Sequence, residues 1–466
     1  MSAESYDCVI LGGGPGGYPA AIRAAQLGLR TALVEAEHLG GICANWGCIP
    51  TKALLRASEL HHLIGRAAEF GIEVGEVRID LEKLVERSRR VADRMAGGVR
   101  HLLKKNGVVL VEGRARLAGA GRVEVEGSEG RSQLAADHVV LATGARARSL
   151  PGLEPDGETI WTYREAMVPA ALPESLLVVG SGAIGIEFAS FYRDLGVEVT
   201  VVELLPRILP AEDEEISAFA RKALERQGMA IHTEAALSSL VRRGSGVEAA
   251  GKLADGQPLA LEAERAILAV GITGNVEELG LESTAVRVEA GHIETDAWCR
   301  TAEPGIYAIG DVAGPPYLAH KASHEGVLCV ESIAGQTGLH PLDRTKIPGC
   351  TYSRPQVASV GLSERAARDA GHSVRVGRFP LRGNGKAVAI GDTEGLAKTV
   401  FDARTGELLG AHLVGPEVTE MIQGFVVARG LETTEAELME AVYPHPTLSE
   451  SMHESVLDAF ERAIHI

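Results

Sequence analysis

The sequence is poor in aromatic residues, in cysteine and in long apolar runs, and each scarcity excludes a class of protein. Phe, Trp and Tyr together make up 4% of the 466 residues, and only six cysteines are present. No window of about 18 uninterrupted apolar residues occurs, so we expect no membrane span. The opening segment MSAESYDCVIL has no basic leader before an apolar core. We therefore expect no secretory signal and a cytoplasmic protein.

Positive charge is also in short supply. Lys and Arg number 46 against 63 Asp and Glu, which gives a net charge of -17. Nucleic-acid binding requires clustered cations, so a general nucleic-acid binder is excluded. Apolar residues amount to 45%, enough for several hydrophobic cores, and the length predicts about three domains. The 55 glycines favour an α/β protein with many tight turns.

What the chain has in abundance is a glycine-rich unit that occurs twice. The unit reads YDCVILGGGPGGYPAAIRAAQLGLRTALVE at 6–35 and LLVVGSGAIGIEFASFYRDLGVEVTVVE at 176–203. Each copy is an apolar run, then G-x-G-x-x-G, a helical pattern and a β-rich run that ends in Glu. The interval from the third glycine to that glutamate is 18 residues in both copies. The six glycines are Gly12, Gly14, Gly17, Gly180, Gly182 and Gly185.

This pattern is typical of a dinucleotide-binding fold. The first glycine permits a tight turn, the second lets the backbone approach a pyrophosphate, and the third allows close packing of helix and strand. The amides at the helix N-terminus then face the phosphates. Glu35 and Glu203 stand where a carboxylate accepts hydrogen bonds from an adenosine ribose. Because the whole unit is repeated, the sequence predicts two dinucleotide sites.

Later segments indicate how the two folds are arranged along the chain. HVVLATGA (138–145) and RAILAVGI (265–272) are apolar runs that end in a small-residue turn, one late in each half. GIYAIGDVAG (305–314) is a further strand that ends in Gly-Asp. We therefore expect the second fold to be inserted into the first. Asp311 is then at the carboxyl edge of a strand, where open α/β sheets bind ligands, or it simply forms a turn.

The remaining segments mark domain edges. LPGLEPDGE (150–158) is a linker, and 245–259 predicts an exposed hairpin with its turn at Asp255-Gly256. The acidic EDEE at 212–215 predicts a solvated helix start. Beyond 347 the pattern favours an antiparallel sheet backed by helices.

The segment GGICANWGCIPTKALL (40–55) carries two of the six cysteines, Cys43 and Cys48. In a regular helix, residues five apart have Cα atoms about 8–9 Å apart, whereas a disulfide requires less than about 7 Å. The pair can therefore close only if the segment is irregular, and Gly47 and Pro50 supply irregularity. We expect the cysteines around the distorted first turn of a helix, where the dipole and Lys52 lower the pKa of a thiol.

A redox-active disulfide is one of three interpretations of this pair, beside a metal clip and accidental packing. A zinc site requires a second pair of ligands, and the other cysteines occur singly in runs that we expect to be buried. Near the other end, YPHPTLSESMHESVLDAF (443–460) places His445 between two prolines and five residues before Glu450. A thiol-exchange enzyme needs a base with a near-neutral pKa, and His445 oriented by Glu450 fits that role.

Together these segments resemble the flavin-dependent pyridine nucleotide–disulfide oxidoreductases, most closely those that oxidise protein-bound dihydrolipoamide to lipoamide with NAD⁺. The resemblance covers essentially the whole chain and rests on GGGPGG, GGICANWGCIPTKALL, GSGAIGIE, AIGDVAGPPYLAHKASHEG and HPTLSE. It implies two Rossmann-like domains, for FAD and NAD, and a C-terminal α+β dimerisation domain. The implied domains are an FAD-binding domain at 1–150, an NAD-binding domain at 151–272, a central domain that completes the FAD site at 273–346, and an interface domain at 347–466.

The resemblance also implies a role for each matching residue. Cys48 is expected to lie nearest the flavin and to form a redox disulfide with Cys43, which exchanges with the dithiol substrate. His445 and Glu450 are expected to come from the other subunit of a homodimer. Lys52 and Glu187 are expected to form an ion pair beside the flavin. The implied cofactor contacts are Gly12, Gly14, Gly17, Glu35, Lys52, Arg114, Ala115, Thr143, Gly144, Gly180, Gly182, Ile184, Gly185, Glu187, Glu203, Gly271, Asp311, Ala319 and His320.

Cofactor choice and two departures from the family pattern complete these expectations. Glu203 repels a 2′-phosphate, and no arginine follows before Arg207, so NAD is favoured over NADP. Tyr443 stands where the family commonly has a histidine, and Ile272 replaces an arginine after the second AVG strand. Trp46, between the cysteines, is expected to serve packing.

The partners implied are a lipoyl-bearing E2 subunit of a 2-oxoacid dehydrogenase complex or the glycine-cleavage lipoyl protein, with no nucleic acid or membrane. Two alternatives stay open. The first is a related NAD(P)H-dependent reductase of another disulfide or of a metal ion. The second is a flavoprotein that acts as a redox-sensing or scaffold subunit.

Overall fold

The computed structural model describes residues 4–119, 121–128 and 130–465. The chain forms two compact units. Unit 1 comprises residues 1–53, 82–148 and 271–342, and unit 2 comprises residues 54–81, 149–270 and 343–466. Because unit 1 resumes at 271 after a complete second sheet, the expected insertion of one nucleotide fold into another is confirmed.

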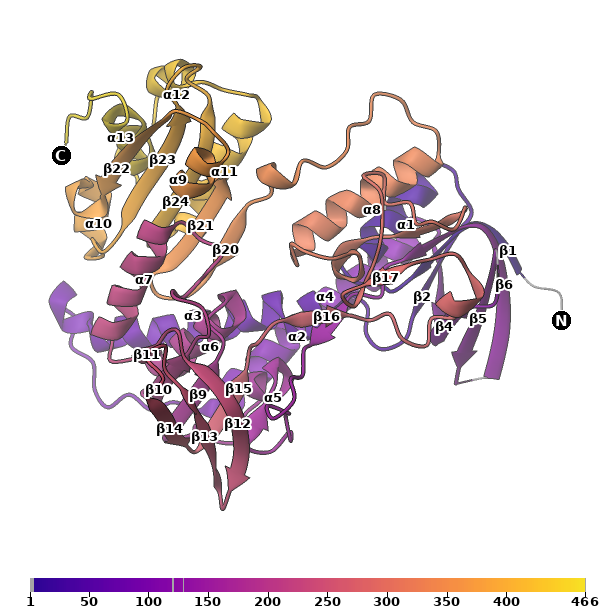
Figure 1. The fold of residues 1–466 in the computed structure, drawn as a ribbon, viewed down its shortest axis with the longest axis horizontal. Coiled ribbons are helices and arrows are strands. Elements are labelled where there is room, and N and C mark those ends of the chain that lie inside the picture. The colour runs from indigo at the N-terminus through magenta and orange to yellow at the C-terminus, as the bar shows by residue number, and fades with distance from the viewer. Residues whose placement is uncertain (1–3, 120, 129, 466) are drawn as a thin grey trace. The chain divides into compact units, whose positions relative to one another are not determined.

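Unit 1 is built on a sheet whose centre is the first strand of the chain. The strands in spatial order are β3 (Val109–Glu112), β2 (Thr31–Glu35), β1 (Glu4–Leu11), β6 (Gly130–Leu141), β5 (Arg122–Gly127) and β4 (Arg114–Leu117), and β19 (Ile306–Ala308) also pairs with β6 (Figure 1). β1 is parallel to both β2 and β6. Residues 8–11 of β1 are buried on both faces, which is the pattern of a central parallel strand.

Helices and short strands complete unit 1. The helices are α1 (Gly17–Gln26), α2 (Gly41–Trp46), most of α4 (Leu81–Lys105) and α8 (Ala319–Ile333), with α3 (Cys48–Gly65) passing from unit 1 into unit 2. The short elements are β7 (Ala145–Ala147), β16 (Ile272–Gly274), β17 (Val288–Glu289), β18 (His292–Ile293), η2 (Leu281–Ser283) and η3 (Gly310–Ala313). A Cβ atom on Gly326 of α8 would lie 2.5 Å from the carbonyl oxygen of Gly16. The glycine therefore lets α8 pack directly on the turn before α1.

Unit 2 contains a second sheet, whose first four strands follow the order of the parallel strands in unit 1. Its strands in spatial order are β11 (Ala230–His232), β10 (Glu198–Val202), β9 (Ser175–Val179), β15 (Arg265–Leu268) and β8 (Ile160–Trp161). The helices are α5 (Tyr163–Met167), α6 (Ala183–Asp194) and α7 (Glu214–Arg226), and β12 (Ala236–Arg243), β13 (Gly246–Lys252) and β14 (Pro258–Ala263) form a separate sheet. β13 and β14 are antiparallel, with Gly256 at a φ of 81° between them. The predicted hairpin is therefore confirmed.

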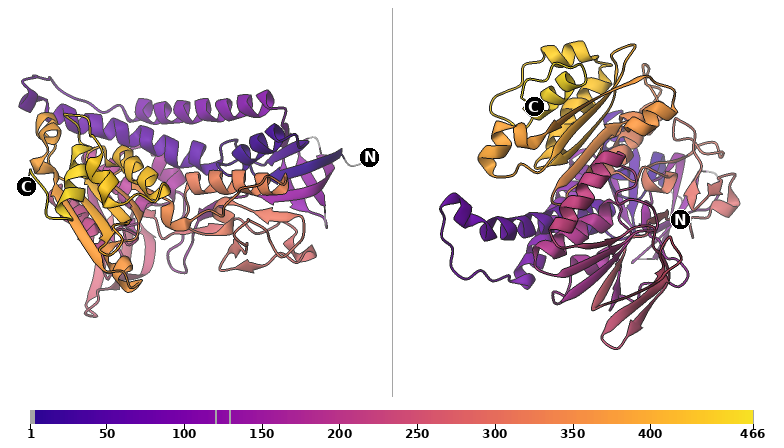
Figure 2. Two further views of the ribbon diagram at one scale, coloured as in Figure 1. Left: turned by 90° about the horizontal axis from the view of Figure 1, so that it is seen from above. Right: turned by 60° about the vertical axis from the view of Figure 1, so that its left-hand side comes forward.

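The C-terminal part of unit 2 is an antiparallel sheet backed by helices, as expected. Its strands in spatial order are β20 (Gly349–Thr351), β21 (Gln356–Gly361), β24 (Leu408–Gly415), β23 (Leu396–Asp402) and β22 (Val374–Pro380). The helices are α9 (Glu364–Asp369), α10 (Gly385–Ile390), α11 (Val418–Gly430), α12 (Glu435–Glu440) and α13 (Glu450–Asp458), and the remaining short turns of unit 2 are η1 (Ala67–Phe70), η4 (Arg344–Lys346) and η5 (Leu381–Gly383). Every residue of β23 and β24 is buried. Figure 2 shows this sheet in orange beside its yellow helices.

The acidic start of α7 differs from the expectation of a solvated helix end. Asp213 is the N-cap, accepts a hydrogen bond from the Glu215 amide and is 2% exposed. Lys398 of β23, also 2% exposed, contacts Asp213 at 2.8 Å and both Glu215 and Glu364 at 3.0 Å. The solvated-start prediction was wrong, because a lysine 185 residues away in the chain covers these carboxylates.

Among the described residues, no helix combines the length and apolarity needed to cross a membrane.

Candidate functional site

The first glycine turn is shaped by two contacts within the chain. Gly12 has a φ of 108°, and a Cβ atom there would lie 2.3 Å from the carbonyl oxygen of Ala142. A Cβ atom on Gly17 would lie 1.8 Å from the carbonyl oxygen of Gly12. A side chain at either position would collide with backbone, so the turn and the start of α1 require both glycines.

The middle glycine of this turn has no such reason within the chain. The nearest atom to a Cβ on Gly14 would be the Cα of Gly41, at 3.8 Å, which is ordinary van der Waals contact. The missing side chain leaves backbone exposed above the N-terminus of α1. A pyrophosphate bound at that helix end needs such an approach. The turn therefore fits the diphosphate of FAD.

The second turn reproduces this geometry. Gly180 has a φ of 99°, and its Cβ atom would lie 2.3 Å from the carbonyl oxygen of Ala269. A Cβ atom on Gly185 would lie 2.0 Å from the carbonyl oxygen of Gly180, whereas a Cβ atom on Gly182 would meet nothing within 4 Å. Again the first and third glycines serve packing and the middle one leaves space. The turn fits the diphosphate of NAD.

Each turn is accompanied by one fixed carboxylate. Glu35 accepts hydrogen bonds at 2.7 Å from the amides of Gly13 and Glu37. Glu203 accepts hydrogen bonds at 2.8 Å from the amides of Ser181 and Leu205, and one at 2.6 Å from the Ser181 hydroxyl. A carboxylate has about four lone-pair sites, so each retains acceptor capacity for a ribose hydroxyl. The ribose contacts themselves stay predictions.

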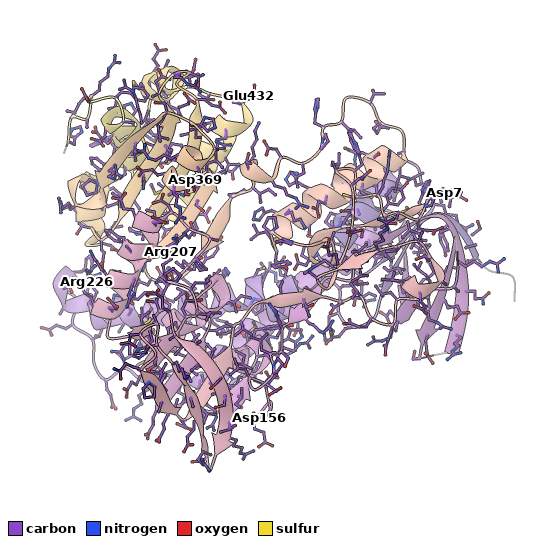
Figure 3. The ribbon with its side chains drawn as sticks, viewed as in Figure 1. Asp7, Asp156, Arg207, Arg226, Asp369 and Glu432 are labelled. Atoms are coloured by element: carbon purple, nitrogen blue, oxygen red, sulfur yellow. The ribbon has the colours of Figure 1, made fainter. Side chains whose placement is uncertain are left out.

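The surroundings of Glu203 bear on cofactor choice. Glu203 is 7% exposed. Arg207, labelled in Figure 3, forms an ion pair with Glu214 at 2.9 Å. The arginine after the second β-rich run is therefore paired with an acidic partner.

Several predicted FAD contacts lie close to the first turn within unit 1. The Gly113 amide donates to the carbonyl of Glu35 at 2.9 Å, which brings the following Arg114 and Ala115 next to the end of β2. Thr143 donates its hydroxyl to the Asn275 carbonyl at 2.8 Å. A hollow beside Glu35 is lined by residues of three segments. They are Glu35, Ala36, Glu37, His38, Leu39, Ala96, Gly97, Arg100, Leu110 and Glu112.

Other predicted cofactor residues have more varied settings. Gly144 has a φ of 71° and Gly271 a φ of 108°. Ile184, the second residue of α6, is 43% exposed, and its contact with NAD stays a prediction. Ala319 is the first residue of α8, and His320 follows it on the surface.

Asp311 lies on η3, directly after β19, as the sequence predicted. Burial raises the pKa of its carboxyl, while Lys321 acts in the opposite direction. Lys321 and Glu325, both in α8, are buried around this turn. Both lie in the HKASHEG segment (320–326), whose spacing alone does not mark them as functional residues.

The cysteine pair spans the junction of two helices. Cys43 lies in the short α2, Gly47 ends that helix with a φ of -147° and a ψ of -120°, and Cys48 is the first residue of α3. A Cβ atom on Gly47 would lie 3.1 Å from the carbonyl of Ile42. The predicted irregularity at Gly47 is confirmed, whereas Pro50 sits in the first turn of α3 without breaking it.

The structure holds the pair as thiols, with Cys43 in hydrogen-bond contact with Cys48. That contact and burial raise the pKa of the Cys43 thiol, and the charge of Lys52 acts in the opposite direction. The expectation of a lowered thiol pKa is therefore wrong for Cys43, because a proton shared between two sulfurs is retained. Cys48 occupies the N-terminus of α3, where the helix dipole favours a negative charge.

Trp46 has the packing role expected of it. The Arg89 guanidinium lies over the Trp46 ring at 4.5 Å, and the same side chain donates to the carbonyl of Asn45 at 2.7 Å. Arg89 thus ties α4 to the end of α2.

His445 and Glu450 form the predicted pair. Nδ1 of His445 lies 2.8 Å from Glu450 Oε1, and the ring is 78% exposed. Burial opposes the ionised form of Glu450, but the Thr447 amide and His445 donate hydrogen bonds that keep the pKa of the carboxyl below its usual value. With Nδ1 held, Nε2 is available to exchange a proton with a substrate. Tyr443 stacks on His453, with ring centroids 5.0 Å apart.

Lys52 lies in unit 1 and Glu187 in unit 2. Glu187 is 5% exposed and accepts a hydrogen bond from the Tyr352 amide at 2.9 Å. The ion pair between Lys52 and Glu187, and the meeting of His445 with the cysteines, stay predictions.

Comparisons with known proteins match nearly the whole chain. A family described as pyridine nucleotide-disulphide oxidoreductase matches residues 6–326, and its dimerisation domain matches residues 347–456. The protein called dihydrolipoyl dehydrogenase from Rhizobium etli is 54% identical, covering 99% of this chain and 99% of that protein. Its counterpart from Zymomonas mobilis is 55% identical, covering 99% and 100%.

Two solved structures share this architecture. LpdA from Mycobacterium tuberculosis superposes with a TM-score of 0.89 at 30% identity, covering 97% of this chain and 99% of that one. The HOCl-induced flavoprotein disulfide reductase RclA from Escherichia coli superposes with a TM-score of 0.85 at 25% identity, with the same coverage.

Proposed function

The chain belongs to the pyridine nucleotide-disulphide oxidoreductase family, and on that premise we propose that it is a dihydrolipoyl dehydrogenase. The reaction oxidises protein-bound dihydrolipoamide to lipoamide and reduces NAD⁺ to NADH. The observation that carries the proposal is the thiol contact between Cys43 and Cys48 in a chain that also has two dinucleotide turns. Full-length relatives at 54% and 55% identity with this name support it.

The chain's own residues can hold both nucleotides. Gly14 and Glu35 would hold FAD at the first turn, with Asp311 on the sugar chain, and Gly182 and Glu203 would hold NAD at the second. FAD, when bound, supplies the two-electron transfer between the cysteine pair and NAD⁺. The protein supplies placement, charge and the thiol chemistry.

The thiol chemistry follows from the different settings of the two sulfurs. In the oxidised state, a substrate thiolate attacks Cys43 of the Cys43–Cys48 disulfide, and Cys48 leaves as a thiolate. Cys48 is the better leaving group because it lies at the N-terminus of α3, where the helix dipole stabilises its thiolate. The second substrate thiol then attacks the mixed disulfide and releases Cys43. The substrate loses two electrons and two protons, and the cysteine pair gains the electrons.

His445 is the base that takes the proton from the attacking thiol. Glu450 fixes its Nδ1 and stabilises the imidazolium that forms. The match to a dimerisation domain supports a homodimer, in which His445 of one subunit serves the cysteine pair of the other. We also propose that the chain has four domains, at 1–150, 151–272, 273–346 and 347–466.

The physiological partner that we propose is a lipoyl-bearing protein, either an E2 subunit of a 2-oxoacid dehydrogenase complex or the glycine-cleavage lipoyl protein. A cytoplasmic location agrees with a transient, catalytic disulfide, because structural disulfides are rare in that compartment.

The test is NADH formation from dihydrolipoamide and NAD⁺ by the purified yellow protein. Cys43→Ser should abolish turnover, whereas Cys350→Ser, a change of a partly buried cysteine in β20, should not. NADH-dependent reduction of another disulfide or of a metal ion, without turnover of dihydrolipoamide, would instead favour the alternative of a related NAD(P)H-dependent reductase.

The role of His445 has a separate test. His445→Ala should lower kcat by at least about 10², the contribution of a general base. His101→Ala, a change of an exposed histidine on α4, is the matched control and should have no effect. An unchanged rate in the His445 variant would refute the assignment.

A further inference from the structure

A buried lysine of α8 holds both ends of the η3 turn. Lys321 is 1% exposed, and its Nζ donates to the carbonyl of Gly310 at 3.0 Å and to the carbonyl of Gly314 at 2.7 Å. It also lies 3.3 Å from Oε2 of Glu325. A lysine ammonium has three donors, and these three acceptors use all of them. The side chain therefore fixes the start and the end of one short segment.

Glu325 holds the same segment from a second side. It is 8% exposed, and its Oε2 accepts a hydrogen bond from the Gly310 amide at 2.8 Å. Gly310 is thus held at its amide by Glu325 and at its carbonyl by Lys321. The two side chains, one helical turn apart on α8, act as a clamp, which we call the Lys321–Glu325 clamp.

The clamped segment would otherwise be flexible. Gly310 has a φ of 71° and Gly314 a φ of 96°, and glycine restricts the backbone least of all residues. Asp311 lies between these two glycines. Without the clamp, the position of the Asp311 carboxylate would vary with both of them.

Stability alone is a weak reason for such a clamp. Burying an ion pair costs desolvation that its attraction often does not repay, and apolar replacements of similar volume are frequently tolerated. The clamp is better explained by the geometry that it imposes. We propose that Lys321 and Glu325 are positioning residues that fix Asp311 for the sugar chain of FAD, an inference that rests on the proposed function because it takes Asp311 as a ligand of FAD.

The chain offers a matched control for removing a buried lysine. Lys398 is buried to about the same extent as Lys321 and is surrounded by carboxylates, but it lies in β23 of unit 2. Lys321→Met and Lys398→Met should be prepared without flavin and titrated with FAD, following the quenching of flavin fluorescence. We expect Lys321→Met to weaken FAD binding at least tenfold, or ~1.4 kcal/mol. Lys398→Met should bind FAD within about twofold of the original protein, whatever its effect on unfolding temperature.

A second readout follows the turn itself. Hydrogen exchange of the flavin-free protein should be faster in the segment 308–314 of Lys321→Met and unchanged there in Lys398→Met. Glu325→Gln keeps an amide oxygen for the Gly310 amide, so it should retain more FAD affinity than Glu325→Ala. That ranking also tests the clamp if Lys321→Met fails to fold.

The outcomes separate this inference from the proposed function. If the unchanged protein binds FAD and Lys321→Met, folded, binds it equally well, the clamp has no positioning role. The positioning role would also be overturned if Glu325→Gln and Glu325→Ala both bound FAD as tightly as the original protein. If the unchanged protein binds no FAD, the proposed function fails instead.

Discussion

The two glycine turns of this chain share one geometry but have different supports. In each turn, the first and third glycines avoid a collision with a carbonyl oxygen, and the middle glycine faces open space. In the first, a buried lysine and glutamate of α8 hold the neighbouring Asp311 turn. Unit 2 also has a buried lysine, Lys398, but this lysine ties the start of α7 to the C-terminal sheet. The comparison teaches that the glycine turn is repeated, whereas the side chains that hold the surrounding structure differ between the two units.

The largest expected effect is a loss of stability, and we expect it from a side chain at the third glycine of either turn. Gly17→Ala and Gly185→Ala place a Cβ atom 1.8 Å and 2.0 Å from a backbone oxygen. The backbone must shift to accommodate either, so we expect each to lower the free energy of unfolding by about 3 kcal/mol or more. Urea unfolding of the flavin-free variants measures this. Wild-type stability in either variant would show that the turn is not as tight as described.

The next effect distinguishes the two turns by the cofactor that each one binds. Gly14→Ala and Gly182→Ala are sterically tolerated by the chain, so both should fold. We expect Gly14→Ala to weaken FAD binding about 10- to 100-fold, and Gly182→Ala to raise the KM for NAD⁺ by a similar factor while the protein stays yellow. Flavin content and steady-state kinetics distinguish them. A loss of flavin in Gly182→Ala would reverse the assignment of the turns.

A smaller effect concerns the two carboxylates. Glu203→Gln removes the charge that repels a 2′-phosphate, so the ratio of kcat/KM for NADP⁺ to that for NAD⁺ should rise about tenfold. Glu35→Gln is the matched control, because Glu35 accompanies the other turn, and should leave that ratio unchanged. Equal ratios in both variants would remove Glu203 from cofactor selection.

The smallest effect concerns the segment just before α7. Burial, opposed by a hydrogen bond with Ser359, raises the pKa of Glu212 from 4.5 to about 7. Between these pH values the folded protein holds a proton that the unfolded chain has released. The contribution of this group to stability is therefore greatest below pH 4.5 and is lost as the pH rises through about 7.

We expect this loss to be on the order of 1 kcal/mol, the scale of a pKa shift of one unit. Glu212→Gln should remove that part of the pH dependence of the unfolding temperature, measured from pH 5 to 8 by calorimetry. A pH profile that is the same in both proteins would exclude Glu212 as its source.

The sequence predicted the features that depend on local spacing. Local spacing predicted the two G-x-G-x-x-G turns and the pairing of His445 with Glu450. It also predicted the inserted second fold, because each copy of the glycine unit has a fixed order of strand, turn and helix. The break at Gly47 was likewise predictable, because a regular helix keeps residues 43 and 48 too far apart.

Features that depend on distant residues were not predicted. The acidic start of α7 was interpreted as solvated because nothing near it in the sequence reveals Lys398. Lys321 and Glu325 were overlooked since a lysine is normally exposed, and only the tertiary structure shows its three acceptors on the η3 turn. The raised pKa of Cys43 depends on contact between two sulfurs, which spacing alone cannot give.

The central claim is that one dithiol passes its electrons through the cysteine pair to a nucleotide held at the second turn. The most direct measurement is anaerobic mixing of dihydrolipoamide with the yellow Gly182→Ala protein, followed by flavin absorbance and then by NADH formation on adding NAD⁺. The account predicts that the dithiol changes the flavin absorbance, because its electrons enter the cysteine pair and the flavin beside it, and that little NADH forms at ordinary NAD⁺ concentrations. A flavin spectrum that the dithiol leaves unchanged, or NADH formed as fast as in the unchanged protein, would contradict it.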